Sequence, residues 1–293
     1  MKRMLLVVNP SAGQKRVKRY TTEIIDIFNR AGFQVEVHIT AQQGEAIQVV
    51  EQRAADKDIV VCAGGDGTLN ETITGILHAG SASPIGYIPC GSTNDFASSL
   101  KLPSNVLQAA RRIANGTPTS YDVGQFDGRY FSYVASFGAF TKASYSTPQN
   151  IKNALGHTAY VLEGIQELSQ IRKEHIRLEA DGQILEDDFL FGAISNSTSV
   201  GGLLTLDPSQ VDMGDGMFEI LLVRSPRNLA ELHECIQAVR TQKYNCSMIT
   251  FFSAKEVLIQ ADPAMCWTLD GEKELGHEMI QVKNLHHAIT LIK

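Results

Sequence analysis

Residues 59–71 read IVVCAGGDGTLNE, and the rest of the chain is interpreted outward from this stretch. The apolar run 59–62 predicts a buried strand, and the helical spacing of apolar residues from Leu69 onward predicts a helix. Three glycines in residues 64–67 permit positive φ angles and let backbone N–H groups approach a ligand without a Cβ in the way. The first turn of a helix also presents unpaired N–H donors and the positive end of a dipole, so this turn suits an anion.

Asp66 is the unusual residue of this loop, because a carboxylate beside a phosphate repels it. A divalent cation between the two anions would remove the repulsion, as would a hydrogen-bond donor for Asp66. Asp66 therefore indicates a metal-assisted phosphate site. The alternative is that Gly-Gly-Asp-Gly is only a tight connection from strand to helix. The sequence has no Walker motif and no G-x-G-x-x-G after the first strand, so neither standard nucleotide fingerprint is supported.

Composition excludes several classes of protein. The chain has 293 residues, ample for two domains, with 43% hydrophobic and 20% charged residues, as in globular proteins. Its net charge of −6 argues against a nucleic-acid binder held by bulk electrostatics. No apolar run approaches the roughly 18 residues that cross a bilayer, and the apolar stretch near the N-terminus is too short for a secretion signal. The five scattered cysteines form no C-x-x-C pair, so we expect reduced thiols and a cytoplasmic protein.

Strands and helices alternate in the first part of the chain. Strands are predicted at 4–8, 33–39, 59–62 and 84–89, and helices at 17–31, 44–55, 69–77 and 106–114. This order is typical of a parallel sheet with helices on both faces.

From about residue 120 the pattern becomes antiparallel and β-rich. Asp127-Gly128 and Asp181-Gly182 lie between apolar segments and predict hairpin turns. Further strands are predicted at 217–223, 248–252, 257–260, 280–282 and 288–292, with helices at 159–171 and 229–239. We therefore expect an α/β domain of residues 1–120 and a β-rich domain of residues 121–293, whose last strand could return to the first domain.

Polar, glycine-containing loops follow three strands of the predicted parallel sheet, at 9–13, 64–70 and 91–95, and Thr40 ends a fourth strand. Ligands of open parallel sheets bind outside the carboxyl ends of the strands. Convergence of these loops on one edge thus indicates a single site, rich in N–H and hydroxyl donors and carrying the carboxylates of Asp66 and Asp95. Such a cradle suits a nucleoside triphosphate with magnesium.

The motifs NPSAG, GGDGTLNE and GSTNDF, in this order and spacing, resemble those of the soluble bacterial diacylglycerol kinase family. These enzymes belong to the lipid kinases that include sphingosine and ceramide kinases. Asp270-Gly271-Glu272 resembles the catalytic D-G-E of the family, and Asp215-Gly216-Met217 resembles its structural magnesium element, so the resemblance covers essentially the whole chain. GGDGT alone is shared with NAD kinases and phosphofructokinases, whereas the set of four is specific. Ser92 is a small departure, because the family pattern has Thr there.

The resemblance implies an N-terminal nucleotide-binding α/β domain, a C-terminal antiparallel β-sandwich that holds substrate and metal, and an active site in the cleft between them. It implies transfer of the γ-phosphoryl group of ATP to a lipid hydroxyl, with diacylglycerol as the expected acceptor and phosphatidic acid as the product. A structural Mg²⁺ would take the Asp215 carboxylate and backbone carbonyls of Asp212 and Met217. The residues implied to contact ATP are Asn9, Pro10, Ser11, Ala12, Gly13, Thr40, Gly64, Gly65, Asp66, Gly67, Thr68, Leu69, Asn70 and Ser92.

The transfer also needs an acceptor for the hydroxyl proton. The resemblance implies Asp270 as this base, with Glu272 as the second candidate and Asp66 and Asp95 as the other catalytic carboxylates. From local sequence alone, Asp-Gly after a strand is more often a hairpin turn. We expect Asp270→Asn to abolish transfer while leaving nucleotide binding and the melting temperature nearly unchanged.

Two other functions remain open: a kinase of another lipid alcohol or of NAD, and a non-catalytic nucleotide-binding regulator. GSTNDF argues against an NAD kinase, and the intact carboxylates argue against loss of activity. We expect a lipid substrate at the membrane surface, peripheral association with the inner face and no nucleic-acid partner; an edge strand would allow a homodimer. Residues 148–155 and 201–206 are candidate walls for an acyl chain. His286 and His287 are interpreted as solvent-facing residues of a terminal strand rather than metal ligands.

Overall fold

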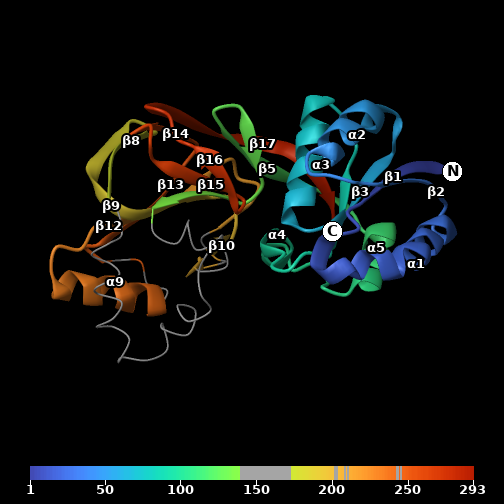
Figure 1. Cartoon of the computed structure of the whole chain (residues 1–293), viewed down its shortest axis with the longest axis horizontal. Helices are drawn as coiled ribbons and strands as arrows, with labels where there is room; N and C mark the ends of the chain where they lie inside the picture. Colours follow the sequence, from blue (N-terminus) through green and yellow to red (C-terminus); the bar gives the residue numbers. More distant parts are fainter. Residues whose placement is uncertain (139–172, 201–203, 208, 210, 242–243, 245) are drawn as a thin grey trace. The chain divides into compact units, whose positions relative to one another are not determined.

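The computed structural model describes residues 1–138, 173–200, 204–207, 209, 211–241, 244 and 246–293 (Figure 1). The chain divides into two compact units. Unit 1 comprises residues 1–123, 213–216 and 285–293, and unit 2 comprises residues 124–212 and 217–284. A domain boundary at residue 120 stays a prediction. Among the described residues, no helix combines the length and the apolar character that crossing a membrane requires.

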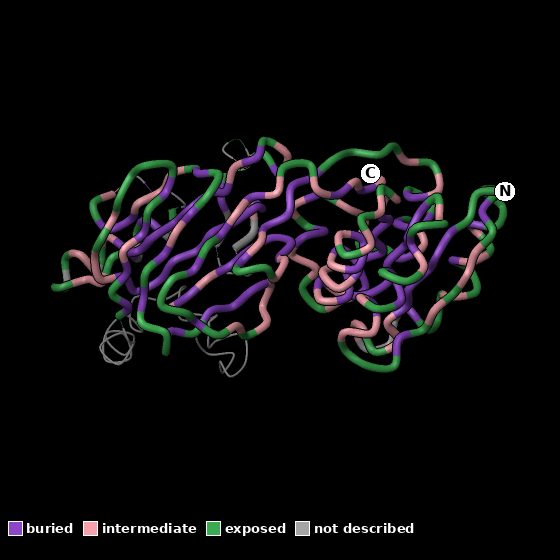
Figure 2. The backbone as a smooth tube through the Cα atoms, turned by 90° about the horizontal axis from the view of Figure 1, so that it is seen from above, coloured by how far each residue is buried: buried purple, intermediate pink, exposed green. Residues whose placement is uncertain are grey.

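Unit 1 contains the predicted parallel sheet. Its strand order is β2-β1-β3-β4, and the end of a long strand from the C-terminus, β17, pairs in parallel with β4 at Leu291 and Ile85. β3 is buried along its whole length, as its unbroken apolar run predicts. Figure 2 shows buried backbone in the interior of the unit that contains the N-terminus. The strands are β1 (Lys2–Val8), β2 (Phe33–Ile39), β3 (Ile59–Gly64), β4 (Ile85–Pro89) and β17 (Met279–Ile292).

Helices cover both faces of this sheet (Figure 1). On one face, Phe28 of α1 and Ile113 of α5 pack in one apolar cluster with alternate residues of β1 and β3. On the other face α2 and α3 pack closely, because a Cβ at Gly75 would lie 2.7 Å from the Cβ of Val50. The helices are α1 (Arg16–Arg30), α2 (Glu45–Arg53), α3 (Asp66–His78), α4 (Asp95–Ser99) and α5 (Val106–Asn115), with short 3₁₀ turns at Ala12–Lys15 and Ala54–Asp56.

Unit 2 is antiparallel, as the sequence predicts. Its strands follow the order β16-β15-β7-β9-β8-β14-β17, with β12 and β13 continuing from β9 and β6 paired with β5. Trp267 packs edge-on against Phe126 and Phe137 in its core. The elements are β5 (Pro118–Phe126), β6 (Arg129–Phe131), β7 (Val134–Gly138), β8 (Glu174–Ala180), β9 (Gln183–Ser195), β10 (Ser199–Val200), β11 (Leu204–Thr205), β12 (Phe218–Arg224), α9 (Leu229–Thr241), β13 (Ile249–Ala254), β14 (Glu256–Gln260), β15 (Cys266–Leu269) and β16 (Glu272–Leu275).

Three hairpins of unit 2 turn on the same dipeptide. The Asp and Gly of each turn have φ angles of 45° and 93° at Asp127, 48° and 84° at Asp181, and 51° and 85° at Asp270. Positive φ at both central residues is the type I′ geometry for which Asp-Gly is favoured. The two hairpins predicted at Asp127 and Asp181 are therefore confirmed, and Asp270 is also a hairpin turn.

Some elements differ from the sequence predictions. The strands expected at 280–282 and 288–292 are one continuous strand, β17, in which the alternation of buried and more exposed residues changes phase at His286 and His287. The helix α4 was not predicted, since its five residues are too few to show a periodicity. The predicted helix at 159–171, the segment 148–155 and residues 201–203 lie outside the described residues.

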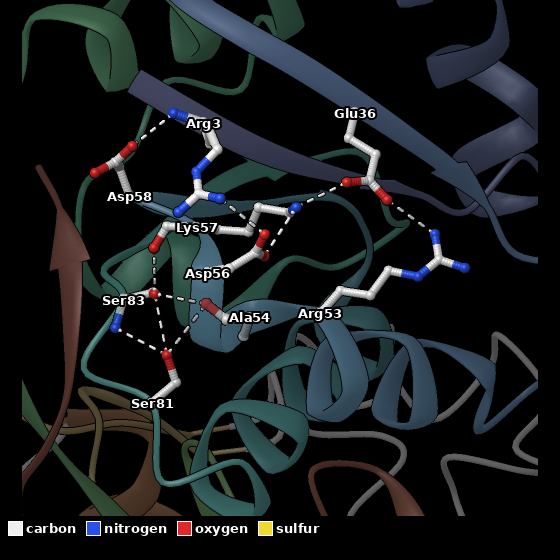
Figure 3. A network of polar contacts seen from close by, with 9 residues as sticks. All are labelled: Arg3, Glu36, Arg53, Ala54, Asp56, Lys57, Asp58, Ser81 and Ser83. Carbon is white, nitrogen blue, oxygen red and sulfur yellow. Dashed lines mark hydrogen bonds and ion pairs between the residues drawn. The ribbon is translucent and has the colours of Figure 1, made fainter. Parts of the chain in front are cut away.

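A network of charges joins the amino ends of the strands in unit 1 (Figure 3). The Lys57 ammonium lies 2.8 Å from Glu36 and 2.9 Å from Asp56, and Arg53 lies 3.0 Å from Glu36. The Ser83 hydroxyl before β4 also bonds the Lys57 carbonyl at 2.7 Å. The hydrogen bond to Lys57 lowers the pKa of Glu36, and the same bond raises the pKa of Lys57. This network fixes the segment that leads into β3.

We expect Lys57→Met to lower the free energy of unfolding by about 1–3 kcal/mol, because only 10% of the Lys57 side chain is exposed and its two acidic partners would lose a charged donor. Arg30→Met is the matched control: this ion pair is 80% and 55% exposed, so its loss should cost less than about 0.5 kcal/mol. Chemical denaturation of both variants measures their free energies of unfolding. Equal losses of stability would contradict a larger role for the Lys57 network than for an exposed ion pair.

The same comparison has a defined pH dependence. The lowered pKa of Glu36 means that the stabilisation is present above its ordinary value of 4.5 and is lost as pH falls through the folded value. Because the pKa of Lys57 is raised, the contribution of Lys57 is fully present below pH 10.5, its ordinary pKa, and is lost only as pH rises through the folded pKa. The gap between wild type and Lys57→Met should therefore be constant near neutral pH and narrow on acidification.

Candidate phosphate-binding site

The four strands are parallel in the order β2-β1-β3-β4, so the chain adds β2 on one side of β1 and then β3 and β4 on the other. The topological switch point of the sheet therefore lies between β1 and β3. In doubly wound sheets, the loops on the two sides of such a point diverge and leave a crevice at the carboxyl edge, where ligands bind. The loops after β1 and β3 contain Asn9–Gly13 and Gly64–Gly67, which are two of the three segments that the sequence singles out. The topology thus places the predicted loops where this class of sheet binds ligands.

The backbones of the three loops touch at glycines. A Cβ at Gly13 would lie 1.8 Å from the carbonyl oxygen of Cys90, so the first loop lies directly against the end of β4. A Cβ at Gly91 would lie 2.7 Å from the Cα of Gly65, so the second and third loops are in contact as well. Only glycine fits these positions, and the predicted convergence is present in unit 1.

Polar side chains lock the first loop to α3. Asn9 donates from Nδ2 to the hydroxyl of Thr68 at 3.0 Å, and its Oδ1 accepts the N–H of Ser11 at 3.0 Å. Thr68 is buried in the first turn of α3. The N–H groups of that turn have no partner within the helix, so the positive end of the α3 dipole lies beside the loop at residues 9–13. This arrangement can bind an anion.

Asp66 connects the second loop to the third. Its carboxylate accepts the N–H of Asp95 at 3.0 Å and lies within reach of the hydroxyls of Thr93 at 3.5 Å and Tyr87 at 3.4 Å. Burial raises the pKa of Tyr87 well above 10.0, and the charge of Asp66 acts in the same direction, so this hydroxyl stays protonated and donates. The unusual carboxylate of the glycine loop therefore has donors within the protein.

Asn94 shapes the third loop and was not singled out by the sequence analysis. Its φ of 53° is in the left-handed region, its Oδ1 accepts the N–H of Gly91 at 2.8 Å, and its Nδ2 donates to the Gly91 carbonyl at 3.0 Å. Asn tolerates the left-handed conformation better than most residues. The Asn of GSTNDF is therefore the local signal that could have predicted a turn at this position.

The remaining residues expected at the nucleotide lie in different environments. Thr40 is buried at the end of β2, and its N–H donates to the Val8 carbonyl at 2.9 Å. Ser92 is exposed on the third loop, while Pro10, Ala12, Gly67 and Asn70 are half-buried or buried around the glycines. Leu69 is 0% exposed, so its side chain belongs to the core and only its backbone lies near the site.

In unit 2, Asp270 is held by the backbone of another segment. Its carboxylate accepts the N–H groups of Ser132 at 2.5 Å, Tyr133 at 3.0 Å and Val134 at 3.1 Å. Burial raises the pKa of Asp270, and these three hydrogen bonds oppose the shift. In Asp270→Asn, the side-chain NH₂ would face a backbone N–H donor in place of an acceptor oxygen. We therefore expect this variant to have a lower melting temperature, in place of the unchanged one expected from the sequence.

Glu272 has a different environment. Its carboxylate pairs with the Arg129 guanidinium at 2.7 Å, and Arg129 also binds Glu274 at 2.5 Å. The Glu272 side chain is 40% exposed, and its carboxylate is occupied by this ion pair. Of the two acidic residues in the D-G-E motif, Asp270 has the environment that suits a base.

The predicted magnesium ligands share one loop. Asp215 is exposed and belongs to unit 1, whereas Asp212 is exposed and belongs to unit 2 together with Met217, whose carbonyl accepts Nδ2 of Asn284 at 2.9 Å. Carboxylate and carbonyl oxygens are the donors that Mg²⁺ prefers, so the chemistry of the set fits the ion. The Gly216 N–H next to Asp215 donates to the buried carboxylate of Asp122 at 2.6 Å. The sequence analysis missed Asp122, which is distant in the chain.

We expect Gly13→Ala to lower the free energy of unfolding by more than about 3 kcal/mol, because it combines a left-handed backbone with a clash against the Cys90 carbonyl. Gly80→Ala is the matched control: Gly80 has a φ of 57° but no atom within 4 Å of an added Cβ. It should cost only the backbone strain of about 1–2 kcal/mol. Thermal and urea unfolding compare the two, and equal costs would show that the first and third loops do not touch.

Comparisons with known proteins give independent information. A family model described as the diacylglycerol kinase catalytic domain matches residues 3–126, and one described as the YegS C-terminal NAD kinase beta sandwich-like domain matches residues 134–293. A diacylglycerol kinase of Bacillus subtilis (strain 168) is 32% identical over 275 residues, which cover 93% of this chain and 90% of that protein.

A diacylglycerol kinase of Staphylococcus carnosus (strain TM300) is 33% identical over 275 residues, covering 92% of this chain and 89% of that protein. A solved structure described as a diacylglycerol kinase from Bacillus anthracis str. Sterne shares the fold, with a TM-score of 0.78 and 24% identity over 99% of this chain and 96% of that one. The match of the relatives extends over both units. The chain therefore belongs to the diacylglycerol kinase family.

Proposed function

We propose that the protein transfers the γ-phosphoryl group of ATP to the hydroxyl of diacylglycerol and forms phosphatidic acid. Membership of the diacylglycerol kinase family supports a lipid kinase. The observation that carries the nucleotide assignment is the contact of three glycine loops at the carboxyl edge of one parallel sheet, beside the start of α3. Such an edge presents N–H donors to a chain of phosphates.

In this proposal, unit 1 holds the triphosphate. Backbone N–H groups of residues 9–13 and 64–67 bind phosphate oxygens, apart from those of Asn9, Ser11 and Ala12, which already donate within the protein. Ser92 and Thr40 lie on the adjoining loops. Asp66 fixes the relation of these loops through the Asp95 N–H, so the phosphates meet preorganised donors. A Mg²⁺ bound with the triphosphate would neutralise phosphate charge, with Asp66 and Asp95 as the carboxylates on these loops. A separate structural Mg²⁺ would take the Asp215 carboxylate and the backbone carbonyls of Asp212 and Met217.

Asp270 is the proposed base that accepts the proton of the lipid hydroxyl. Its three backbone hydrogen bonds hold the carboxylate in one orientation, and burial raises its pKa. Both effects suit general-base catalysis, which needs a positioned group with a pKa closer to the working pH. Glu272 is proposed to hold Arg129 rather than to accept the proton.

The three Asp-Gly turns provide a test of this role. Asp270→Asn should reduce kcat by at least about 100-fold, because general-base catalysis is typically worth 10²–10⁴. Asp181→Asn changes the same residue of an equivalent turn, where the carboxylate accepts the Lys255 N–H at 3.0 Å. It should lose about 1 kcal/mol of stability but keep its kcat. If the two variants lose activity in proportion to their stability, Asp270 is only a turn residue.

The pH dependence of kcat follows from the same pKa. A base acts in its ionised form, so kcat should fall as pH drops through the folded pKa of Asp270, which is raised above the ordinary value of 3.8. The dissociation constant of ATP should not show this fall at the same pH. A kcat that is constant from about pH 4 to about pH 7 would contradict the raised pKa of the base.

The proposed activity is tested with γ-labelled ATP, magnesium and mixed micelles that contain diacylglycerol, a sphingoid base or undecaprenol, with NAD in solution as a further acceptor. The expected result is label in phosphatidic acid that is absent with Asp270→Asn. Label in another lipid phosphate would keep the kinase and change the substrate. Label only in NADP, or ATP binding without any transfer, would overturn the proposal in favour of an NAD kinase or a regulator.

A further inference from the structure

A cluster of potential metal ligands in unit 1 is separate from the residues proposed for ATP and magnesium. Asp122 of β5 and the neighbouring His286 and His287 of β17 each place one ligand atom within 4.8 Å of the other two. Asp122 is 0% exposed, whereas both histidines are exposed. A fixed carboxylate at the base and accessible imidazoles above it form a site that an ion can enter from solvent.

The backbone is distorted where the two histidines meet. Consecutive residues of a strand point to opposite faces, so neighbouring histidines should not meet. His287 instead has a φ of 52°, and the rings of His286 and His287 stack with centroids 3.8 Å apart and planes at 25°. A left-handed backbone is strained for a residue other than glycine, so the fold maintains this pairing against strain.

The distances between ligand atoms are close to those around a zinc ion. Nδ1 of His286 lies 3.1 Å from Oδ1 of Asp122, and Nε2 of His287 lies 3.0 Å from the Gly214 carbonyl oxygen. In a tetrahedral zinc site with bonds of about 2.0–2.2 Å, neighbouring ligand atoms are about 3.3–3.6 Å apart. These two distances would lengthen by a few tenths of an ångström on binding, and the stacked rings would turn so that each points a nitrogen at the ion in its own plane.

We propose that Asp122, His286 and His287, together with the carbonyl of Gly214, bind a divalent transition-metal ion of the zinc class. Two imidazole nitrogens favour such an ion over Mg²⁺, which prefers oxygen. Asp122 also accepts the N–H groups of Gly216 at 2.6 Å and His287 at 2.7 Å, so the buried carboxylate is held in place before the ion binds. The site is thus preorganised around its negative charge.

Binding at this site would act on the loop of residues 213–216. His287 contacts Gly214 and Asp122 contacts Gly216, and these two glycines flank Asp215. An ion held by the histidines would therefore restrain the segment that contains Asp215. The inference concerns binding to residues of unit 1 and does not depend on the identity of the phosphoryl acceptor.

The test is a titration of the chelator-treated full chain with CoCl₂ and ZnCl₂ in a large excess of Mg²⁺. The expected result is one ion per chain, visible Co²⁺ absorption bands typical of nitrogen ligands, displacement of Co²⁺ by Zn²⁺ and a rise in melting temperature. His286→Gln and His287→Asn should each weaken Zn²⁺ binding by more than about tenfold. Asn is chosen at position 287 because it tolerates the positive φ there.

His277→Asn is the matched control. His277 is 62% exposed and lies 3.0 Å from the Asp127 carboxylate, but it belongs to no cluster of three potential metal ligands in the described part of the chain, so its removal should leave Zn²⁺ affinity unchanged. If neither metal binds in excess Mg²⁺, or if His286→Gln and His287→Asn bind Zn²⁺ as tightly as wild type, the inference is overturned. His286→Gln serves alone if His287→Asn unfolds, because its ring is exposed and its replacement leaves the strained backbone intact.

Discussion

The hydrogen bond from the Asp95 N–H to the Asp66 carboxylate joins two of the three loops on which the candidate site depends. Asp66 begins α3 and Asp95 begins α4, so the bond fixes the start of one helix against the start of the other. The glycines make this distance reachable, because Gly65 and Gly91 touch through their backbones. A negative side chain in the first turn of α3 is itself favourable to the helix dipole. The loops are thereby preorganised, with their N–H groups fixed at one edge of the sheet.

The two ends of the parallel sheet in unit 1 have different roles. The Lys57 network binds the segments that enter β1, β3 and β4 at the amino ends, where charged groups pair with one another (Figure 3). The carboxyl ends have glycines, hydroxyls and amide donors. Stability is thus supported at one end while the other remains available to bind an anion, which is the usual division in open α/β sheets.

Local patterns were enough to predict the strands, the main helices and the loops of the candidate site. The apolar run 59–62 and the glycines after it are short-range signals of a buried strand and a turn, and both are present. The interactions that the sequence did not reveal join distant residues. Asp270 accepts N–H groups from residues 132–134, and Asp122 contacts His287, 165 residues away. Nothing local in those sequences indicates such partners.

The amide groups of the three loops provide the most direct measurement of the central claim that they form one nucleotide site. Hydrogen exchange followed by mass spectrometry compares the full chain with and without ATP and magnesium. The account predicts that protection rises together at residues 9–13, 64–68 and 91–95, because one bound phosphate chain restrains all three loops. Protection confined to one of these loops, or absent from all three while ATP is bound elsewhere, would contradict it.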